Sequence, residues 1–559
     1  MLTRLGPLLT ILILTGPVIF GLAGTVLPAF GFLPALGGME FTLAHFRELF
    51  SEPAIFMSAT LSLLAGLVTA LVSLLAVMLF VAGFAGTRLF GRVQHLVSPL
   101  LSVPHAAAAF ALAFLIAPSG MLARLVSPEI TGWDRPPDLL IVNDPMGLSM
   151  MAGLVAKEIP FLLLMTLAAL PQVQLHQTRM LTTSVGYGRV AGFLFGLWPA
   201  VYRQIRLPVF AVIAFASSLV DVAMILGPTR PAPLAARLLV WMNDPDLSMR
   251  YLASAGALLQ LAVTALALLA WLGLERFGAA LCRQAAMRGR RFRRDAMLRA
   301  GALAVMVLAA GVVFAGLGTL AVWSFAGLWQ FPDALPSTFT LKSWMTTLPR
   351  ILEPLQTTLL AGLLSTFIAS ILAILCLAHE DETGGRPGRG ALTLLYLPLL
   401  VPQVAFIFGL QLFLIYAGVL ATLPALVLAH LVFVMPYAYL ALKDPWHAFD
   451  RRYDWLAAGL GKRRARRFFS VRLPMMARSI LTMAAIGFAI SVGLYLPTVL
   501  AGAGRLTTIT SEAVALSSGG NGRVIGVYAF WQMLLPIAGF AVATLVPALI
   551  FRRFRGMQV

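Results

Sequence analysis

The sequence has few charged residues. Asp, Glu, Lys and Arg together make up 11% of the 559 residues, whereas a soluble domain has about 25%. Hydrophobic residues reach 60% of the chain, against roughly 45–50% in a soluble protein. These proportions exclude a soluble globular protein and a disordered chain, and they favour a protein with repeated transmembrane helices.

Cysteine is almost absent. Cys282 and Cys376 are too few for a disulfide scaffold and cannot form a metal site on their own. Both lie near helix ends that the charge pattern described below places in the cytoplasm, so we expect no structural disulfide. The seven histidines show no metal-ligand spacing. The sequence predicts neither a metal site nor a cofactor.

Motifs of catalysis are missing as well. Gly461-Lys462 lacks the upstream glycine and the hydroxyl residue of a Walker A motif, so we do not expect this chain to hydrolyse ATP. Gly186-Tyr187-Gly188 lacks the preceding strand of a dinucleotide-binding loop. No nucleophile elbow is present either. We therefore expect a transport protein rather than an enzyme.

Long apolar runs dominate what is present. A membrane-spanning helix needs about 20 mostly apolar residues. The first run follows Arg4 and is longer than the apolar core of a signal peptide, so we interpret it as an uncleaved helix; cleavage near residues 21–24 is the alternative. The region 391–442 is continuously apolar and allows other divisions. Twelve spans are predicted, at 5–30, 56–85, 95–118, 147–171, 205–227, 251–275, 299–328, 353–378, 391–418, 420–442, 477–501 and 524–551.

Acidic residues are scarce relative to basic ones. Lys and Arg number 41 and Asp and Glu 22, a net charge of +19, and only four of the basic residues are lysines. In a soluble protein this excess would suggest nucleic acid as a partner. Here 30 of the 41 basic residues fall in alternate loops, and ten fall in the opposite loops. The excess on one side predicts an inner-membrane protein with both termini in the cytoplasm, and no nucleic-acid partner.

The sequence contains an internal repeat. Pro160 and Pro436 lie in the fourth and tenth predicted spans, and a glycine follows 26 and 25 residues later, at Gly186 and Gly461. A Phe-Ala-x-Ser motif then begins at 215 and again at 488. We predict two parallel six-helix domains, 1–276 and 299–559, joined by a basic cytoplasmic linker at 277–298. A pathway between the halves is the physical implication.

Each half carries a long polar loop after its fourth span, at 172–204 and 444–474. In the loop at 444–474 we expect a short helix that ends at Gly461, a C-cap with positive φ. A second short helix should follow, until Pro474 breaks the chain before the eleventh span. A helix–turn–helix on the membrane surface is suited to docking in the groove of a partner.

The loop at 444–474 resembles the EAA loop of binding-protein-dependent ABC import permeases. That pattern is Glu-Ala-Ala, three residues, Gly, nine residues and Ile-x-Leu-Pro. Trp455 stands in the Glu place beside Asp454, and Leu456 stands in the first Ala place. The residues that match or substitute conservatively, at the right spacing, are Ala457, Gly461, Val471, Leu473 and Pro474.

The loop at 172–204 is a more distant match. Gly186 and Pro199 keep the 13-residue interval, while Met180, Leu181 and Thr182 hold the Glu-Ala-Ala places. A fused pair of six-helix domains resembles the thiamine and ferric-iron import permeases. This resemblance implies that the two loops seat on two copies of an ABC ATPase subunit and that a periplasmic binding protein delivers the solute. It extends over nearly the whole chain but does not identify the substrate.

Other interpretations apply to the charged loop residues. The basic run at 462–467 lies beside the EAA-like motif, and it can equally serve membrane orientation and contact with lipid headgroups. The charges of the opposite loops suit a binding protein or an ordinary solvated loop. Lipid is therefore a third expected partner.

Four ionisable residues fall inside predicted spans, where such groups are costly and often functional. Lys157 and Glu158 point about 100° apart on their helix, so they do not form a simple pair. Lys157 could face the pathway or be balanced by Asp221; a structural tie between helices is the alternative. Asp221 is a candidate for substrate contact or a gate. His430 is a candidate for the pathway, with a fully bonded core histidine as the alternative.

These observations predict an all-α membrane protein of about twelve spans, the fused permease subunit of an ATP-driven importer. Its solute would be of the thiamine-like, iron or polyamine class. The alternative is a secondary transporter with two six-helix halves, which would be ion-coupled through Lys157, Glu158 or Asp221 and would need no ATPase partner.

Overall fold

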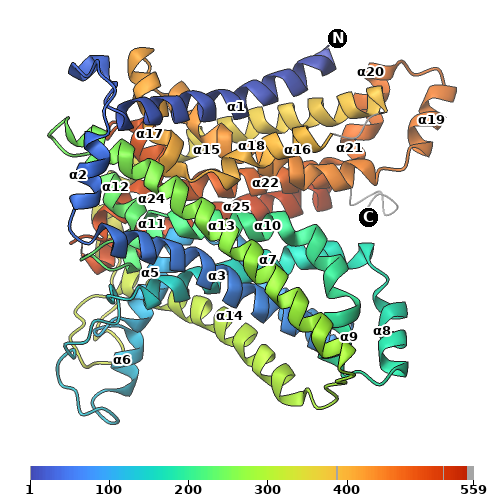
Figure 1. Ribbon diagram of the computed structural model, residues 1–559, viewed down its shortest axis with the longest axis horizontal. Coiled ribbons are helices and arrows are strands. Elements are labelled where there is room, and N and C mark those ends of the chain that lie inside the picture. Colours follow the sequence, from blue (N-terminus) through green and yellow to red (C-terminus); the bar gives the residue numbers. More distant parts are fainter. Residues whose placement is uncertain (1, 385–387, 520, 551–559) are drawn as a thin grey trace.

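The fold is described by a computed structural model that covers residues 2–384, 388–519 and 521–550. Within these residues the elements are helices, turns and two isolated β-bridges, with no strand, so the all-α prediction is confirmed (Figure 1). Of the basic residues used to predict orientation, Arg386, Arg552, Arg553 and Arg555 lie outside the described residues.

The first half runs through thirteen α-helices. They are α1 (Leu2–Ala29), α2 (Ala44–Ser51), α3 (Ile55–Phe84), α4 (Arg88–Val97), α5 (His105–Ile116), α6 (Met121–Val126), α7 (Leu148–Ala169), α8 (Leu175–Ser184), α9 (Arg189–Gly196), α10 (Trp198–Ser218), α11 (Asp221–Leu226), α12 (Leu234–Met242) and α13 (Met249–Met287). Three 3₁₀ turns accompany them, η1 (Pro34–Leu36), η2 (Ser98–Ser102) and η3 (Leu170–Gln172).

The second half repeats the pattern with α14 (Ala296–Phe325), α15 (Lys342–Thr383), α16 (Arg389–Leu400), α17 (Gln403–Tyr416), α18 (Leu423–His447), α19 (Arg452–Gly459), α20 (Arg464–Arg467), α21 (Leu473–Met475), α22 (Ala477–Gly493), α23 (Leu496–Gly502), α24 (Ile509–Leu516) and α25 (Gly522–Ile550). One π turn, η4 (Phe468–Arg472), precedes α21. Among the described residues, ten helices are long and apolar enough to cross a membrane, or up to twelve if each of two bent pairs counts as one span.

The third and ninth predicted spans, 95–118 and 391–418, are broken, which corrects the prediction of continuous helices. Val103-Pro104 separates η2 from α5, and Val401-Pro402 separates α16 from α17, whose axes differ by 94°. The valines have nearly identical extended backbones, with ψ of 123° and 126°. Proline disfavours the helical conformation at the residue before it, so both halves break at the same dipeptide.

The fifth and eleventh predicted spans, 205–227 and 477–501, are also interrupted. α10 ends at Ser218 and α22 at Gly493, and the next residue of each half, Leu219 or Leu494, is extended. Short helices α11 and α23 then complete each span. A hydropathy average could not reveal these breaks, because the longer apolar runs on both sides outweigh the few residues at each break.

Side-chain contacts reproduce the repeat seen in the sequence. Ser62 of α3 accepts a hydrogen bond from the backbone N–H of Leu234, the first residue of α12, at 3.0 Å. Thr358 of α15 accepts the corresponding bond from Ile509, the first residue of α24, also at 3.0 Å. Helices α3 and α15 therefore hold equivalent places, with Ser62 matching Thr358.

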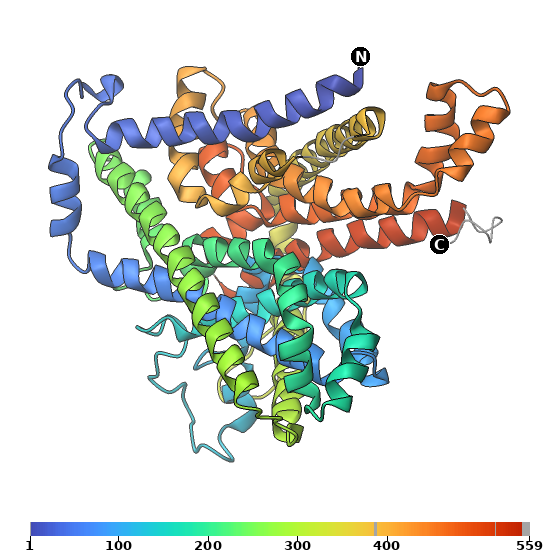
Figure 2. The ribbon, with the colours of Figure 1, turned by 45° about the vertical axis from the view of Figure 1, so that its right-hand side comes forward.

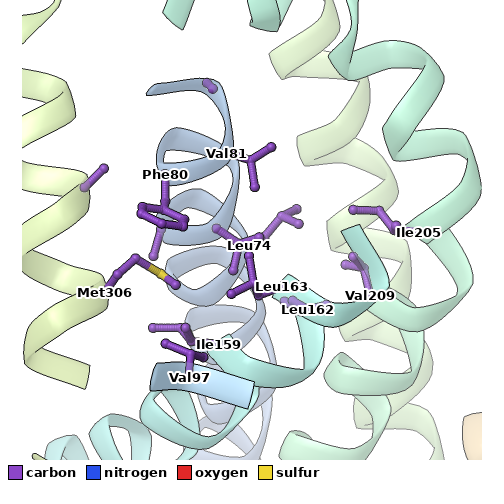
Figure 3. Packing of buried hydrophobic residues seen from close by; sticks show 14 of the residues in the cluster. Leu74, Phe80, Val81, Val97, Ile159, Leu162, Leu163, Ile205, Val209 and Met306 are labelled. Atoms are coloured by element: carbon purple, nitrogen blue, oxygen red, sulfur yellow. The ribbon is translucent and has the colours of Figure 1, made fainter. Parts of the chain in front are cut away.

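The first helix of each half packs on the other half. α1 runs along α17 and α15 (Figure 1). An added Cβ at Gly24 would lie 2.8 Å from the Cα of Gly409. α14 packs against α5 and α3, where Met306 joins a cluster with Phe80 and Ile159 (Figure 3). Several buried clusters therefore contain residues of both halves.

The segment predicted as a linker, 277–298, is mostly helical. α13 continues to Met287 and α14 begins at Ala296, so only residues 288–295 lie between helices. A 39-residue helix is about 58 Å long at 1.5 Å per residue. α13 therefore extends well past the thickness of a bilayer core, about 30 Å.

Candidate functional site

Two helix–turn–helix segments lie at the same end of the molecule. We call residues 172–204 loop A and residues 444–474 loop B. Figure 1 shows α8 and α9 of loop A and α19 and α20 of loop B at that end, together with the start of α1. The end of α25, in red, points the same way in Figure 2. The two loops thus present their helices on one face.

The turn of loop B has the geometry expected from the sequence. Gly461 has φ of +73°, and its N–H donates to the carbonyl of Ala458 at 2.9 Å. The next N–H, from Lys462, donates to the carbonyl of Ala457 at 3.1 Å. These two bonds form a Schellman cap, which needs a left-handed residue and so favours glycine.

Loop A repeats this turn. Gly186 has φ of +88°, its N–H donates to Thr183 at 2.9 Å, and the N–H of Tyr187 donates to Thr182 at 3.0 Å. The next helix begins three residues after the glycine in both loops, at Arg189 and at Arg464. The weak EAA match of loop A therefore has the same turn geometry as the stronger match of loop B.

The other predicted loop residues lie around these turns. Ala457 is buried, and Thr182 contacts the closely packed Gly192 and Gly196 of α9. Pro199 and Pro474 each stand second in the helix that follows, α10 or α21. Val471, Leu473 and Pro474 lie in the segment 464–475, and a 70° bend separates this segment from α22.

Large apolar side chains are exposed on the first helix of each loop. Their positions relative to the turn glycine are the same in the two loops. In loop A, Met180, Leu181 and Val185 are 62%, 67% and 54% exposed; in loop B, Trp455, Leu456 and Leu460 are 67%, 66% and 80% exposed. Exposed apolar clusters mark interaction sites.

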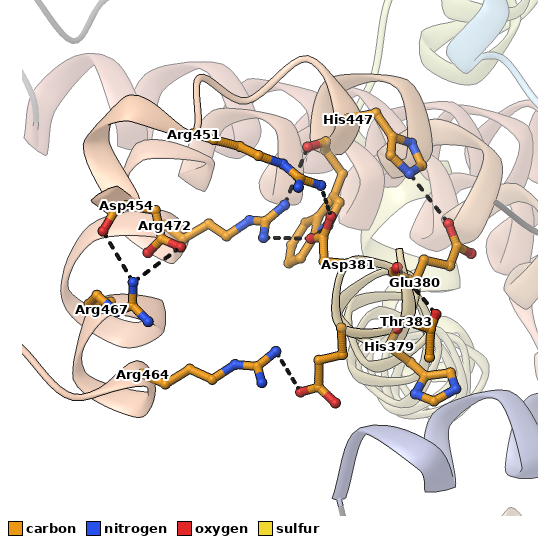
Figure 4. A network of polar contacts seen from close by, with 12 residues as sticks. His379, Glu380, Asp381, Thr383, His447, Arg451, Asp454, Arg464, Arg467 and Arg472 are labelled. Carbon is orange, nitrogen blue, oxygen red and sulfur yellow. Dashed lines mark hydrogen bonds and ion pairs between the residues drawn. The ribbon is translucent and has the colours of Figure 1, made fainter. Parts of the chain in front are cut away.

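An acidic helix end holds loop B in place (Figure 4). Asp381, near the end of α15, pairs with Arg451 at 2.8 Å and with Arg472 at 2.6 Å, and it accepts a bond from Trp446 Nε1 at 2.8 Å. The neighbouring Glu382 pairs with Arg464 at 2.9 Å. Sequence reasoning missed this cluster, although three consecutive acidic residues after an apolar span were a visible signal.

Loop A is held by the segment between the halves. The N–H of Gly188 donates to the carbonyl of Arg291 at 2.9 Å, and Arg293 donates to the carbonyl of Gly186 at 3.2 Å. Asp295 accepts a bond from the N–H of Val190 at 2.9 Å, which caps α9. Residues 288–295 therefore contact the turn that the sequence singled out.

Lys157 and Glu158 lie on either side of the break in the third span. The Lys157 ammonium donates to the carbonyls of Leu100 and Leu101 at 2.9 and 3.1 Å, at the end of η2. Glu158 Oε1 lies 3.0 Å from Nε2 of His105, the first residue of α5. A cation at a carbonyl end and an anion at a helix start are the favourable placements. His105 was not predicted, because its partner comes from another helix.

Asp221 and His430 have different surroundings. Asp221 is 3% exposed at the break between α10 and α11, and its Oδ1 has no hydrogen-bond partner. His430 is 1% exposed, with Nδ1 2.7 Å from Ser491 and Nε2 3.0 Å from Thr498. Both ring nitrogens of His430 are therefore occupied by helix-to-helix bonds, whereas Asp221 keeps an open acceptor.

The break next to Asp221 lies where the halves meet. Val220, Leu494 and Leu496 belong to one buried cluster, which contains residues from the interruptions of both the fifth and the eleventh spans. Among the ion pairs of residues 2–384, 388–519 and 521–550, none joins Lys157 to Asp221, and no group of three His, Cys, Asp or Glu side chains could hold a metal there. The polar groups of the spans thus sit at breaks rather than in a metal centre.

Comparison with known proteins identifies the family. No family model matches the chain. The chain is 32% identical over 507 residues to the inner membrane ABC transporter permease protein YnjC of Escherichia coli strain K12. The alignment covers 90% of this chain and 91% of YnjC. With this identity over nearly its full length, the chain belongs to the inner membrane ABC transporter permeases, which are transport subunits rather than enzymes.

Proposed function

We propose that the chain is the fused permease subunit of an ATP-driven importer, with its two halves, 1–276 and 299–559, as the two permease domains. The observation that carries this proposal is the pair of matching loops at one end of the molecule (Figure 1). Each loop has the same Schellman turn and three exposed apolar residues at the same positions. One ATPase subunit would seat on each loop.

In this proposal the loops transmit movement between the ATPases and the membrane path. Loop B is tied to α15 by ion pairs, and loop A is tied to α14 through Asp295. ATP binding would draw the two ATPase subunits together and move both loops with their helices. Nucleotide state and path opening would then share one equilibrium, which is the condition for coupling.

The proposed path runs between the halves, where Asp221 offers a buried carboxylate with an open oxygen. The alternative of an ion-coupled secondary transporter has lost its main support, because Lys157 is bonded to backbone carbonyls and the chain belongs to an ABC permease family. A buried carboxylate suits a cationic solute, so the thiamine-like, iron and polyamine classes are retained. A periplasmic binding protein would deliver the solute to the opposite end.

Orientation and lipid contact belong to the same proposal. The loop end would face the cytoplasm, together with both termini. Within the described residues no ion pair includes Lys462, Arg463 or Arg466 of loop B, all of which are exposed. These side chains would contact anionic headgroups of the inner leaflet.

The test removes the apolar contacts of each loop. Leu181→Asp in loop A and Leu456→Asp in loop B place a charge at equivalent exposed positions. The matched control is Ile130→Asp, which is 80% exposed in the connection after α6, at the other end of the molecule (Figure 1). The full-length chain would be co-expressed with the candidate ABC ATPase, and both co-purification and ATP hydrolysis would be measured.

We expect Leu181→Asp and Leu456→Asp to reduce ATPase co-purification at least tenfold, since a charge forced into an apolar contact costs more than about 1.4 kcal/mol. The Ile130→Asp variant should behave as wild type. Full assembly and full hydrolysis with both loop variants would refute the proposal.

A further inference from the structure

Loops A and B are anchored to equivalent helices by different chemistry. Ser62 of α3 and Thr358 of α15 occupy the same place, as their matching hydrogen bonds show. Ala85 follows Ser62 in the first half by the same number of residues as Asp381 follows Thr358 in the second half. The repeat therefore places a methyl group in the first half where the second half has the carboxylate that holds loop B.

The two loops also share an arginine close to these positions. Arg189 and Arg464 each begin the second helix of their loop, three residues after the turn glycine. Arg464 pairs with Glu382, beside Asp381, at 2.9 Å. Arg189 Nη2 instead donates to the backbone carbonyl of Ala85 at 2.8 Å. Loop A thus has the matching arginine, Arg189, but the end of α3 has Ala85 where α15 has a carboxylate.

The positive charge behind loop A is only partly compensated. Arg179 also donates to the Ala85 carbonyl, at 3.4 Å, and within the described residues no ion pair includes Arg179 or Arg189. The nearest acid, Asp295, pairs with Arg299 at 3.0 Å and caps α9. Nε of Arg189 is buried without a hydrogen-bond partner. Burial and the charges of Arg179 and Arg299 lower the pKa of Arg189.

A cavity of about 240 Å³ lies at this point. Its wall combines the end of α3 at Ala82 and Ala85 with Arg179, Thr183, Tyr187 and Arg189 of loop A. The rest of the wall includes the apolar side chains of Leu175, Phe193 and Leu197. The two arginines therefore line a cavity beside Ala85, the position that Asp381 holds in the second half. Guanidinium groups bind phosphate oxygens through pairs of N–H donors.

We propose that this cavity binds a phosphate group, whose oxygens bridge the guanidinium groups of Arg179 and Arg189 and so tie α8 to α9. Arg179 comes from α8 and Arg189 from α9, so one bound anion connects both helices of loop A. The phosphate could be free inorganic phosphate or the headgroup of an anionic lipid, since both present the same oxygens. The site is separate from the exposed apolar face of loop A.

The test measures the thermal unfolding of the purified full-length chain in neutral detergent, without any ATPase. Sodium phosphate is compared with sodium chloride at equal ionic strength, and dioctanoyl phosphatidic acid is compared with dioctanoyl phosphatidylcholine. Ala85→Asp restores the carboxylate of the repeat, and Arg189→Gln removes a donor. The matched control is Arg464→Gln, the equivalent arginine of loop B.

In wild type we expect phosphate or phosphatidic acid to raise the unfolding midpoint by about 2 °C or more. The shift should persist in Arg464→Gln and fall to less than half in Ala85→Asp and Arg189→Gln. A shift with inorganic phosphate identifies the free anion as a sufficient ligand, and a shift with phosphatidic acid alone identifies a lipid.

The proposal is overturned if neither anion shifts wild type, or if the full shift survives in both Ala85→Asp and Arg189→Gln. If Ala85→Asp does not fold, the comparison of the anion-induced shift in Arg189→Gln with that in Arg464→Gln decides the question: equal shifts in these two variants overturn the proposal. Because no ATPase is present, the outcome is independent of whether the loops dock on one.

Discussion

At the residue scale, the adjacent charges of Lys157 and Glu158 serve two different segments of one broken span. Lys157 binds the carbonyls that end η2, and Glu158 contacts His105, which begins α5. Their side chains diverge because successive residues of a helix are about 100° apart. The pair therefore stabilises the interruption at Val103-Pro104, and neither charge needs a solute to account for its burial.

We expect Lys157→Met to destabilise the chain by about 1–3 kcal/mol, because the buried carbonyl of Leu100 and the partly buried carbonyl of Leu101 lose their donor. Thermal unfolding in detergent measures the change. Lys342→Met, at the exposed start of α15, is the control and should stay within about 0.5 kcal/mol. An unchanged midpoint in Lys157→Met would show that the ammonium contributes nothing to this break.

Gly461 and Gly459 allow a second comparison, since a methyl group at either position meets nothing within 4 Å. Gly461 is left-handed, with φ of +73°, whereas Gly459 ends α19. Gly461→Ala should cost about 1–2 kcal/mol, while Gly459→Ala should stabilise α19 by up to about 1 kcal/mol. Amide hydrogen exchange in loop B measures both. Equal effects of the same sign would contradict the Schellman turn.

At the element scale, the end of α15 decides how firmly loop B is held. Asp381 is 13% exposed and joins Arg451, Arg472 and Trp446. A carboxylate shared by several partners in a partly buried place is worth more than an isolated surface pair. Loop B should therefore move together with α15.

Asp381→Asn keeps the shape of the side chain but removes its charge. We expect a loss of about 1–3 kcal/mol, concentrated in loop B. Faster proteolysis between α19 and α22 would report it. Asp450→Asn is the matched control, because its partner Arg452 lies 3.9 Å away and is 83% exposed. If both variants are cleaved at the wild-type rate, the cluster does not anchor the loop.

At the scale of the whole molecule, the first helix of each half packs against helices of the other half. α1 packs on α17 and α15, and α14 packs on α5 and α3. Glycines permit the closest approach, since a Cβ on Gly409 would collide with the carbonyl oxygen of Gly21. In a membrane, small residues at such crossings let helix backbones touch. The fused chain therefore folds as one body.

Gly409→Ala should separate α1 from α17 and destabilise the chain by about 1–3 kcal/mol, the usual cost of overpacking. Gly16→Ala, on the same α1 but with open space around it, is the control. Thermal unfolding of both purified variants measures the difference. A Gly409→Ala variant as stable as Gly16→Ala would mean that this crossing is loose.

Some of the fold could be predicted from the sequence because it depends on local chemistry. The turn glycines were visible because a left-handed cap after a short helix selects glycine, and both have positive φ. The breaks at Val103-Pro104 and Val401-Pro402 were missed, although proline was present, because hydropathy averages over the residues around it. The partners of His430 and Lys157 come from other helices and could not be predicted.

The sequence by itself determined the membrane setting, the all-α class, the repeat and the two capped turns, because composition, hydrophobic length and backbone preference act locally. Three features were decided by the tertiary structure alone. α1 and α14 each pack on the opposite half, Asp381 holds loop B, and a cavity lies between Ala85 and loop A. These features depend on which helices meet across hundreds of residues. Which helices meet depends on how well the shapes and charges of distant segments fit each other, and this fit cannot be read from any one segment.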